Sequence, residues 1–160
     1  MPPANPSAQQ ISILIPLAVA TVAILCTIVI HALAVGATLT FIRRERHLGH
    51  AGASFWGNAG IVMVVVSFAF TAHLAEIALW AVLLMLCGEF PESAGAFGHS
   101  AGNYTTLGYG TAVMTPSWRL LGPLEAVNGT LMFGVSTAMI FSIMLRLVRE
   151  RLVEFRDDRA

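Results

Sequence analysis

Lysine is absent from this sequence, and only 11% of its 160 residues carry a charged side chain. Because an ordinary soluble domain contains about 25% charged residues, this scarcity excludes a typical water-exposed surface and indicates a membrane protein. The formal net charge is zero, which provides no overall attraction to nucleic acid, so no nucleic-acid partner is expected. The length favours a single domain.

Patterns typical of enzymes and of metal sites are missing as well. The two cysteines, Cys26 and Cys87, lie inside or at the end of apolar runs and lack metal-ligand spacing. We interpret them as small hydrophobic side chains rather than as a disulfide. The sequence contains no nucleophile elbow, zinc motif or phosphate-cradling loop. We therefore expect no catalytic residues and no organic cofactor.

What the sequence has is three long apolar runs, at about residues 11–42, 55–87 and 120–145. About 20 apolar residues cross a bilayer as a helix, so each run predicts one membrane-spanning helix. A cleaved signal peptide competes for the first run, but its apolar part would be only about 7–15 residues long. We favour a retained helix. The predicted fold is an all-α membrane protein with three transmembrane helices.

The arginines are distributed unevenly around these runs. Eight of the nine follow the first or the third run, and only Arg119 lies between the second and the third. Positive side chains favour the cytoplasmic side, which predicts that residues 43–54 and the amphipathic tail 146–160 are cytoplasmic. Residues 1–10 and 88–119 would lie outside the plasma membrane. The tail could continue the third helix or lie on the membrane surface.

The segment between the last two runs contains "YTTLGYG" at residues 104–110. A loop that enters a membrane has to satisfy its backbone polar groups, either within protein or along a water-filled path. Glycine adopts positive φ readily, so Gly108 and Gly110 allow successive carbonyl groups to face one axis. Such carbonyls can replace the hydration shell of a cation. Thr106 can add its hydroxyl oxygen, and Tyr109 can wedge the loop against surrounding helices.

In this setting, "TTLGYG" resembles the selectivity filter of tetrameric potassium channels, whose usual form is TVGYG. The resemblance covers residues 55–145, the expected pore domain, and is to the prokaryotic two-transmembrane-type pore-loop branch, with residues 11–42 as an extra N-terminal helix. It implies a re-entrant pore helix in "SAGAFGHSAGN", a homotetramer in the lipid bilayer and passive potassium conduction. It places K⁺, and other permeant monovalent cations, at the filter residues Thr106, Leu107, Gly108, Tyr109 and Gly110.

Residues around the filter are expected to support it, namely Tyr104, Thr105, Thr111, Trp118 and Glu125. Thr111 departs from the family, which usually has an aspartate directly after GYG. Gly102 stands where some members carry a glutamate that pairs with this aspartate. Our hypothesis is that packing of Tyr109, Tyr104 and Trp118 holds the filter instead. The alternative is that charge is supplied from other elements by Glu89, Glu92 or Glu125.

Ionisable residues inside the predicted spans raise a second question. His73 and Glu76 are three residues apart and share a helix face, and Glu125 lies near the outer end of the third span. Ionisable groups within a membrane are costly and are usually paired or functional. One interpretation is that the carboxylates hydrogen-bond to neighbouring elements. The other is proton-linked gating, in which Glu125 braces the filter and His73 or His99 titrates.

Alternatives also stay open for the third span and for the function. Gly129 and Gly134 are candidate hinges of a pore-lining helix, but glycine equally permits close packing between membrane helices. Three glycines in the expected pore helix disfavour a stable helix. A weakly selective cation channel and a non-conducting scaffold or regulatory subunit are therefore the competing functions.

Overall fold

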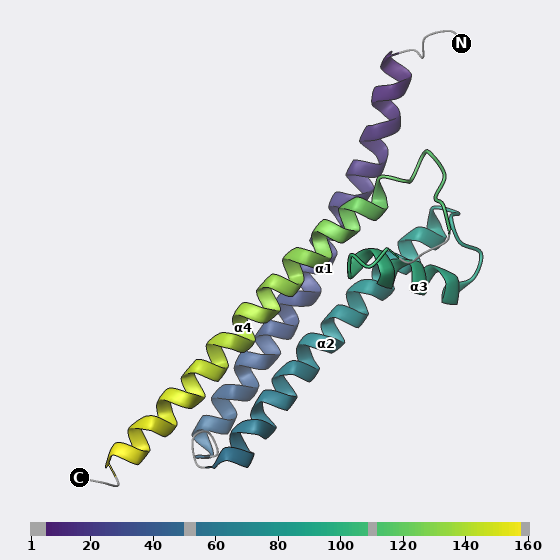
Figure 1. Ribbon diagram of the computed structural model, residues 1–160. Coiled ribbons are helices and arrows are strands. Elements are labelled where there is room, and N and C mark those ends of the chain that lie inside the picture. The colour runs from purple at the N-terminus through teal and green to yellow at the C-terminus, as the bar shows by residue number, and fades with distance from the viewer. Residues whose placement is uncertain (1–5, 50–53, 109–111, 158–160) are drawn as a thin grey trace. The chain divides into compact units, whose positions relative to one another are not determined.

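The computed structural model describes residues 6–49, 54–108 and 112–157 of the chain (Figure 1). Four helices and no strand are present in these ranges. They are α1 (Pro6–His47), α2 (Phe55–Leu86), α3 (Ser93–Tyr104) and α4 (Leu121–Asp157). The all-helical class predicted from the sequence is thus confirmed, with a short helix between the second and third long ones.

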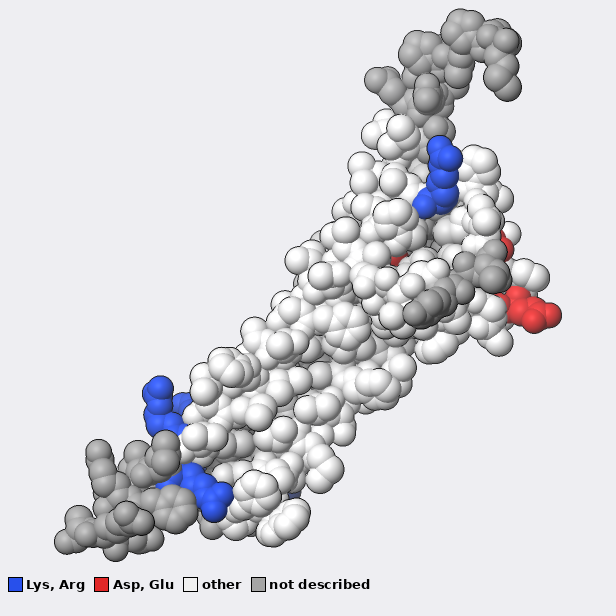
Figure 2. Space-filling view, in the orientation of Figure 1, with Lys and Arg blue, Asp and Glu red and all other residues white. Residues whose placement is uncertain are grey.

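Three of these helices are long and apolar enough to cross a membrane, over Ile13–His47, Phe55–Leu86 and Leu121–Arg149. Most of the surface drawn in Figure 2 is uncharged, and the few charged side chains stand apart from a wide neutral area. A surface of this kind suits a hydrocarbon environment, because each charge placed in one is costly. The three predicted spans are confirmed as candidate membrane helices.

The ends of the long helices follow from local chemistry. Gly88 terminates α2 with a φ of 76°, a left-handed conformation that glycine adopts without a Cβ penalty. The fourth helix does not stop at the end of its apolar run but continues to Asp157. Of the two alternatives for the amphipathic tail, the structure has the one in which the tail continues the third long helix.

The chain divides into two compact units, each containing parts of α1, α2 and α4. Unit 1 comprises Met1–Ile30 and His73–Met132 and therefore includes α3 and the filter segment. Its core contains the fully buried side chains of Trp80, Leu84, Tyr104 and Leu121. Burial of large aromatic and aliphatic side chains supplies most of the packing contacts in such a core.

Unit 2 comprises His31–Ala72 and Phe133–Ala160. Its buried core is formed by Ile61, Val65 and Leu147. The rings of Phe41 and Phe68 meet edge to face there, with centroids 6.1 Å apart, one of the preferred geometries of aromatic pairs. Unit 2 is therefore held mainly by apolar packing.

Candidate functional site

The short helix α3 carries three glycines, yet it is helical from Ser93 to Tyr104. Its buried residues are Ala96, Ser100 and Tyr104, spaced four apart and hence on one face. This face packs into unit 1 and supplies the tertiary contacts that the glycine-rich sequence needs. Packing overrides a low helix propensity in this way, which is the tertiary support that a helix with three glycines was expected to need.

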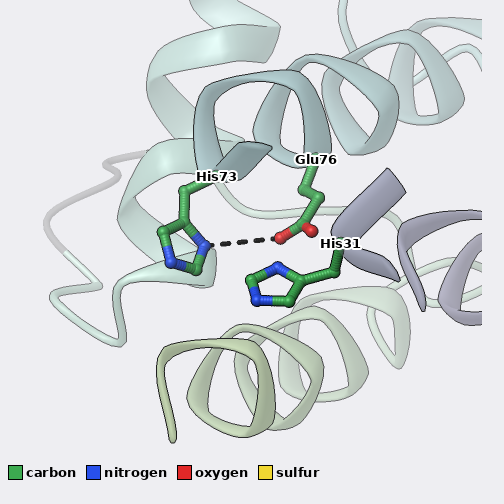
Figure 3. Close-up of side chains that lie close together, drawn as sticks. All are labelled: His31, His73 and Glu76. Atoms are coloured by element: carbon green, nitrogen blue, oxygen red, sulfur yellow. Dashed lines mark ion pairs between the residues drawn. The ribbon is translucent and has the colours of Figure 1, made fainter. Parts of the chain in front are cut away.

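Tyr104 connects α3 to α2 through a buried carboxylate. Its hydroxyl donates a hydrogen bond to Glu76 Oε2 and lies 3.0 Å from His73 Nδ1. His73 Nδ1 also lies 3.4 Å from Glu76 Oε2, as the dashed line in Figure 3 marks. Tyr104 and Glu76 are fully buried. The hydroxyl and the imidazole nitrogen together provide polar partners for a carboxyl group that would be very costly to bury alone.

Burial raises the pKa of Tyr104 above its usual value, and the hydrogen bond to Glu76 and the charges of Glu76 and Glu125 raise it further. The phenol therefore keeps its proton and remains a donor. A consistent set of donors follows from this, in which the tyrosine hydroxyl donates to the carboxylate and His73 Nδ1–H donates to the tyrosine oxygen.

A second buried carboxylate, supplied by α4, also holds α3. Glu125 of α4 lies with Oε1 2.5 Å from Ser100 Oγ, and its Oε2 accepts from Asn103 Nδ2 at 3.3 Å. Ser100 Oγ is also 2.8 Å from the carbonyl oxygen of Ile77 in α2. The Ser100 hydroxyl therefore lies within hydrogen-bond distance of acceptors on both α2 and α4 and shares its single proton between them. Carboxylates from two helices thus fix the second half of α3.

The two glycines considered as hinges differ in their surroundings. A Cβ on Gly129 would lie 2.1 Å from the backbone oxygen of Tyr104, whereas a Cβ on Gly134 would meet nothing within 4 Å. Only glycine permits α4 to approach the end of α3 so closely. The close-packing alternative therefore has a direct structural basis at Gly129, and Gly134 has no such contact.

The filter segment begins where α3 ends. Thr105 is the C-cap residue of α3, and its hydroxyl donates to Ala101 O at 2.6 Å. Thr106 and Gly108 both have left-handed backbone conformations, with φ of 62° and 64°. Leu107 lies between them and is exposed. Backbone handedness thus alternates from residue to residue over this stretch. The remaining predicted filter residues, Tyr109 and Gly110, and the following Thr111 lie outside the described residues.

A cavity of about 580 Å³ adjoins this segment within unit 1. Thr106 and Gly108 line it on one side, and His99, Asn103 and Arg119 contribute its polar side chains. Burial lowers the pKa of His99 below its ordinary 6.5, and the charge of Glu89 partly offsets this effect. The histidine is therefore neutral at pH 7, and the cavity carries the positive charge of Arg119 beside the filter segment.

Glu89 holds the loop between the predicted filter segment and α4, although the sequence indicated it only as a possible source of charge. Glu89 accepts two hydrogen bonds from Thr115, one from its backbone N–H at 2.9 Å and one from its hydroxyl at 2.5 Å. Trp118, predicted as filter support, packs against the core of unit 1. The sequence did not point to Ser100 or Asn103, and the only signal for them was the four-residue spacing of Ser100 from Tyr104 and the three-residue spacing of Asn103 from Ser100.

The described residues form an all-helical structure with three candidate membrane-spanning helices. Two buried carboxylates contact its short helix α3, and an irregular glycine-containing segment follows that helix. Comparison with protein-family models, with curated proteins and with solved structures gives no match to this chain. The function therefore has to be argued from the site itself.

Proposed function

We propose that this chain is one subunit of a homotetrameric potassium channel of the plasma membrane, with Thr106–Gly110 as its selectivity filter. The observation that carries the proposal is the alternation of handedness at Thr106, Leu107 and Gly108, directly after a short helix between two long apolar ones. Alternating handedness turns successive carbonyl groups toward one side, and a ring of carbonyls can replace the water around K⁺.

Exposed apolar side chains near the filter support assembly with further copies. Leu107 is 61% exposed and Val113 is 96% exposed, although both belong to unit 1 and neither is in a long helix. Each chain contributes one filter segment, and a closed filter of the TVGYG type consists of four such segments. In the proposed assembly α3 is a re-entrant pore helix, and neighbouring subunits cover these side chains. The arginine distribution supports an outside N-terminus and a cytoplasmic C-terminus.

The test is rubidium uptake into potassium-loaded proteoliposomes, with a potassium gradient across the vesicle membrane. It is combined with crosslinking of the purified protein. We expect the vesicles with protein to take up more rubidium than protein-free vesicles do. We also expect crosslinking to yield a tetramer. Absence of uptake by the parent protein, or a crosslinked ladder that stops at the dimer, contradicts the proposal.

A pair of glycine substitutions localises the conduction path. A Cβ would meet nothing within 4 Å at Gly108 or at Gly98, but only Gly108 has a positive φ, of 64°. Gly108→Ala strains a left-handed backbone, at a cost of roughly 1–2 kcal/mol, and we expect it to reduce rubidium uptake strongly. Gly98→Ala, within α3, should retain uptake. Equal uptake by the two variants would count against a filter at Gly108.

A weakly selective cation channel is the second candidate, because Thr111 stands where the family has an aspartate. Competition of sodium with rubidium separates the two candidates, since sodium suppresses uptake only through a weakly selective pore. Thr111→Asp should raise potassium flux at low ionic strength, with a gain that shrinks as salt screens the added charges. A non-conducting scaffold is the outcome if no cation passes through an assembled tetramer.

A further inference from the structure

One carboxylate joins the turn after α2 to the loop before α4. Glu89 Oε2 accepts from the Thr115 backbone N–H at 2.9 Å, and Oε1 accepts from the Thr115 hydroxyl at 2.5 Å. Hydrogen bonds to an ionised group are stronger than neutral ones, and two of them in parallel fix orientation as well as distance. Glu89 and Thr115 are 26 residues apart in sequence, so this contact closes the whole loop that contains α3 and the filter segment.

Glu89 is itself held in place on both sides. Its backbone N–H donates to Leu84 O at 3.1 Å, and Gly88 N–H donates to Met85 O at 2.9 Å. This pair of bonds is the Schellman arrangement that ends α2. The next residue, Phe90, packs its ring against His99 of α3, with ring centroids 4.8 Å apart. The carboxylate therefore projects from an ordered turn rather than from a free chain.

Thr115 in turn fixes the start of α4. Its carbonyl oxygen accepts from Trp118 N at 3.1 Å and from Arg119 N at 3.0 Å. Pro116 follows it directly, and a residue before proline is restricted to extended backbone. Trp118 packs against the core of unit 1. A restraint on Thr115 therefore acts both on the chain that leaves the filter segment and on the entry into α4.

We infer that Glu89 is a positioning residue for the loop that joins the filter segment to α4. The inference rests on the proposed function. Both carboxylate oxygens accept a hydrogen bond from Thr115, so Glu89 acts on the filter through the loop. The filter is then anchored at two places, by Glu76 and Glu125 through α3 and by Glu89 through Thr115.

Glu89→Gln tests this inference, because glutamine has nearly the same shape but no charge, so any hydrogen bonds that it keeps with Thr115 lose their charge assistance. The matched control is Glu92→Gln, which removes the same charge from an exposed side chain that makes no cap hydrogen bond with α3. Two measurements are made on the full-length protein in lipid vesicles. One is amide hydrogen exchange of the peptide that contains Thr115, and the other is rubidium uptake with sodium competing.

We expect Glu89→Gln to accelerate exchange at Thr115 by about tenfold, the effect of losing one charge-assisted bond, and to lower the preference for rubidium over sodium. Glu92→Gln should leave both unchanged. Thr115→Ser keeps both donors and should behave as the parent, whereas Thr115→Val, which lacks the hydroxyl, should resemble Glu89→Gln.

The outcomes separate the two claims. Unchanged exchange in Glu89→Gln, or an equal loss of selectivity in Glu89→Gln and Glu92→Gln, overturns the positioning role while the parent still conducts. A parent protein that passes no cation overturns the proposed function and with it the role in conduction, and the exchange data then show independently whether Glu89 holds the loop.

Discussion

Unit 1 and unit 2 bury different chemistry, although each is built from parts of α1, α2 and α4. The buried polar and charged residues of unit 1 include both Glu76 and Glu125, whereas those of unit 2 are His31, Thr38 and Ser136. Burying a carboxylate is far more costly than burying a hydroxyl unless it is well paired. Folding of unit 1 therefore includes the free-energy cost of burying two carboxyl groups, which is absent from the described residues of unit 2.

The cavities of the two units differ less than their buried residues do. The cavity of unit 1, of about 580 Å³, has polar side chains from His99, Asn103 and Arg119 beside the filter segment. A cavity of unit 2, of about 530 Å³, has polar side chains from Asn58, Ser67 and Arg151 among apolar ones. Both cavities are lined mostly by apolar groups, so the buried carboxylates, and not the cavities, distinguish unit 1 from unit 2.

Three buried nitrogen atoms lack a hydrogen-bond partner within the described residues, and all three belong to unit 1: Trp80 Nε1, His99 Nδ1 and Asn128 Nδ2. Each such atom costs about 1–3 kcal/mol. Unpartnered polar atoms of this kind often accompany a functional site. Substitutions confined to one unit measure how much each unit depends on its buried polar contacts and close packing.

The largest effect is expected for Gly129→Ala. Its Cβ would lie 2.1 Å from Tyr104 O, a backbone atom that cannot move without displacing α3, so we expect a loss of about 3 kcal/mol or more. Gly134→Ala, in unit 2, would meet nothing within 4 Å and should stabilise its helix by roughly 0.5–1 kcal/mol. Tryptophan fluorescence during heating in detergent measures both variants.

This pair of variants also decides the role of Gly129. If Gly129→Ala unfolds at the parent's temperature and changes only the cation flux of the proposed channel, Gly129 is a hinge and the close packing against Tyr104 is not required. Loss of thermal stability in Gly129→Ala alone, with Gly134→Ala intact, supports the packing interpretation.

The parts of the fold that the sequence predicts are those that depend on local composition. Long uncharged runs place α1, α2 and α4 within a few residues of their observed limits at most ends, because about 20 apolar residues suffice for a span. The extension of α4 to Asp157 was left open, because an amphipathic tail is compatible with either continuation or surface binding.

The parts that it does not predict depend on contacts between distant residues. Ser100 and Glu125 are 25 residues apart, and Thr27 and Asn128 are 101 residues apart. No local pattern links such partners, so Glu125 was singled out as a charge in an apolar span while its partners were not. The stability of α3 has the same origin, because its buried residues stabilise it only through contacts with α2 and α4.

A moderate effect is expected for Tyr104→Phe, which removes the hydroxyl that contacts Glu76 and His73. A buried charged acceptor then loses a donor, at a cost of about 2 kcal/mol. Ser136→Ala is the counterpart in unit 2, where Ser136 Oγ lies 3.1 Å from His31 Nε2, and a bond between neutral groups contributes about 1 kcal/mol. Thermal unfolding should rank the two variants in this order.

The reverse ranking would show that the carboxylate of Glu76 is not the dominant polar anchor. Combining Tyr104→Phe with Glu76→Gln provides a further check. Since both substitutions break the same contact, the double variant should lose much less than the sum of the single losses. Additive losses would mean that Tyr104 and Glu76 stabilise unit 1 independently.

The smallest effect concerns pH and His99. Burial lowers the pKa of His99 from its ordinary 6.5, with a partial offset from Glu89, so the folded protein binds the proton less readily than the unfolded chain does. Stability contributed by the neutral histidine is complete above pH 6.5 and is lost as the pH falls below that value. Unfolding temperatures between pH 7.5 and 5.5 should fall slightly for the parent and less for His99→Gln. The control is His47→Gln, which removes an exposed histidine of unit 2 and should keep the parent's pH dependence. If the His99→Gln variant keeps the full pH dependence of the parent, the pH dependence arises from a titrating group other than His99.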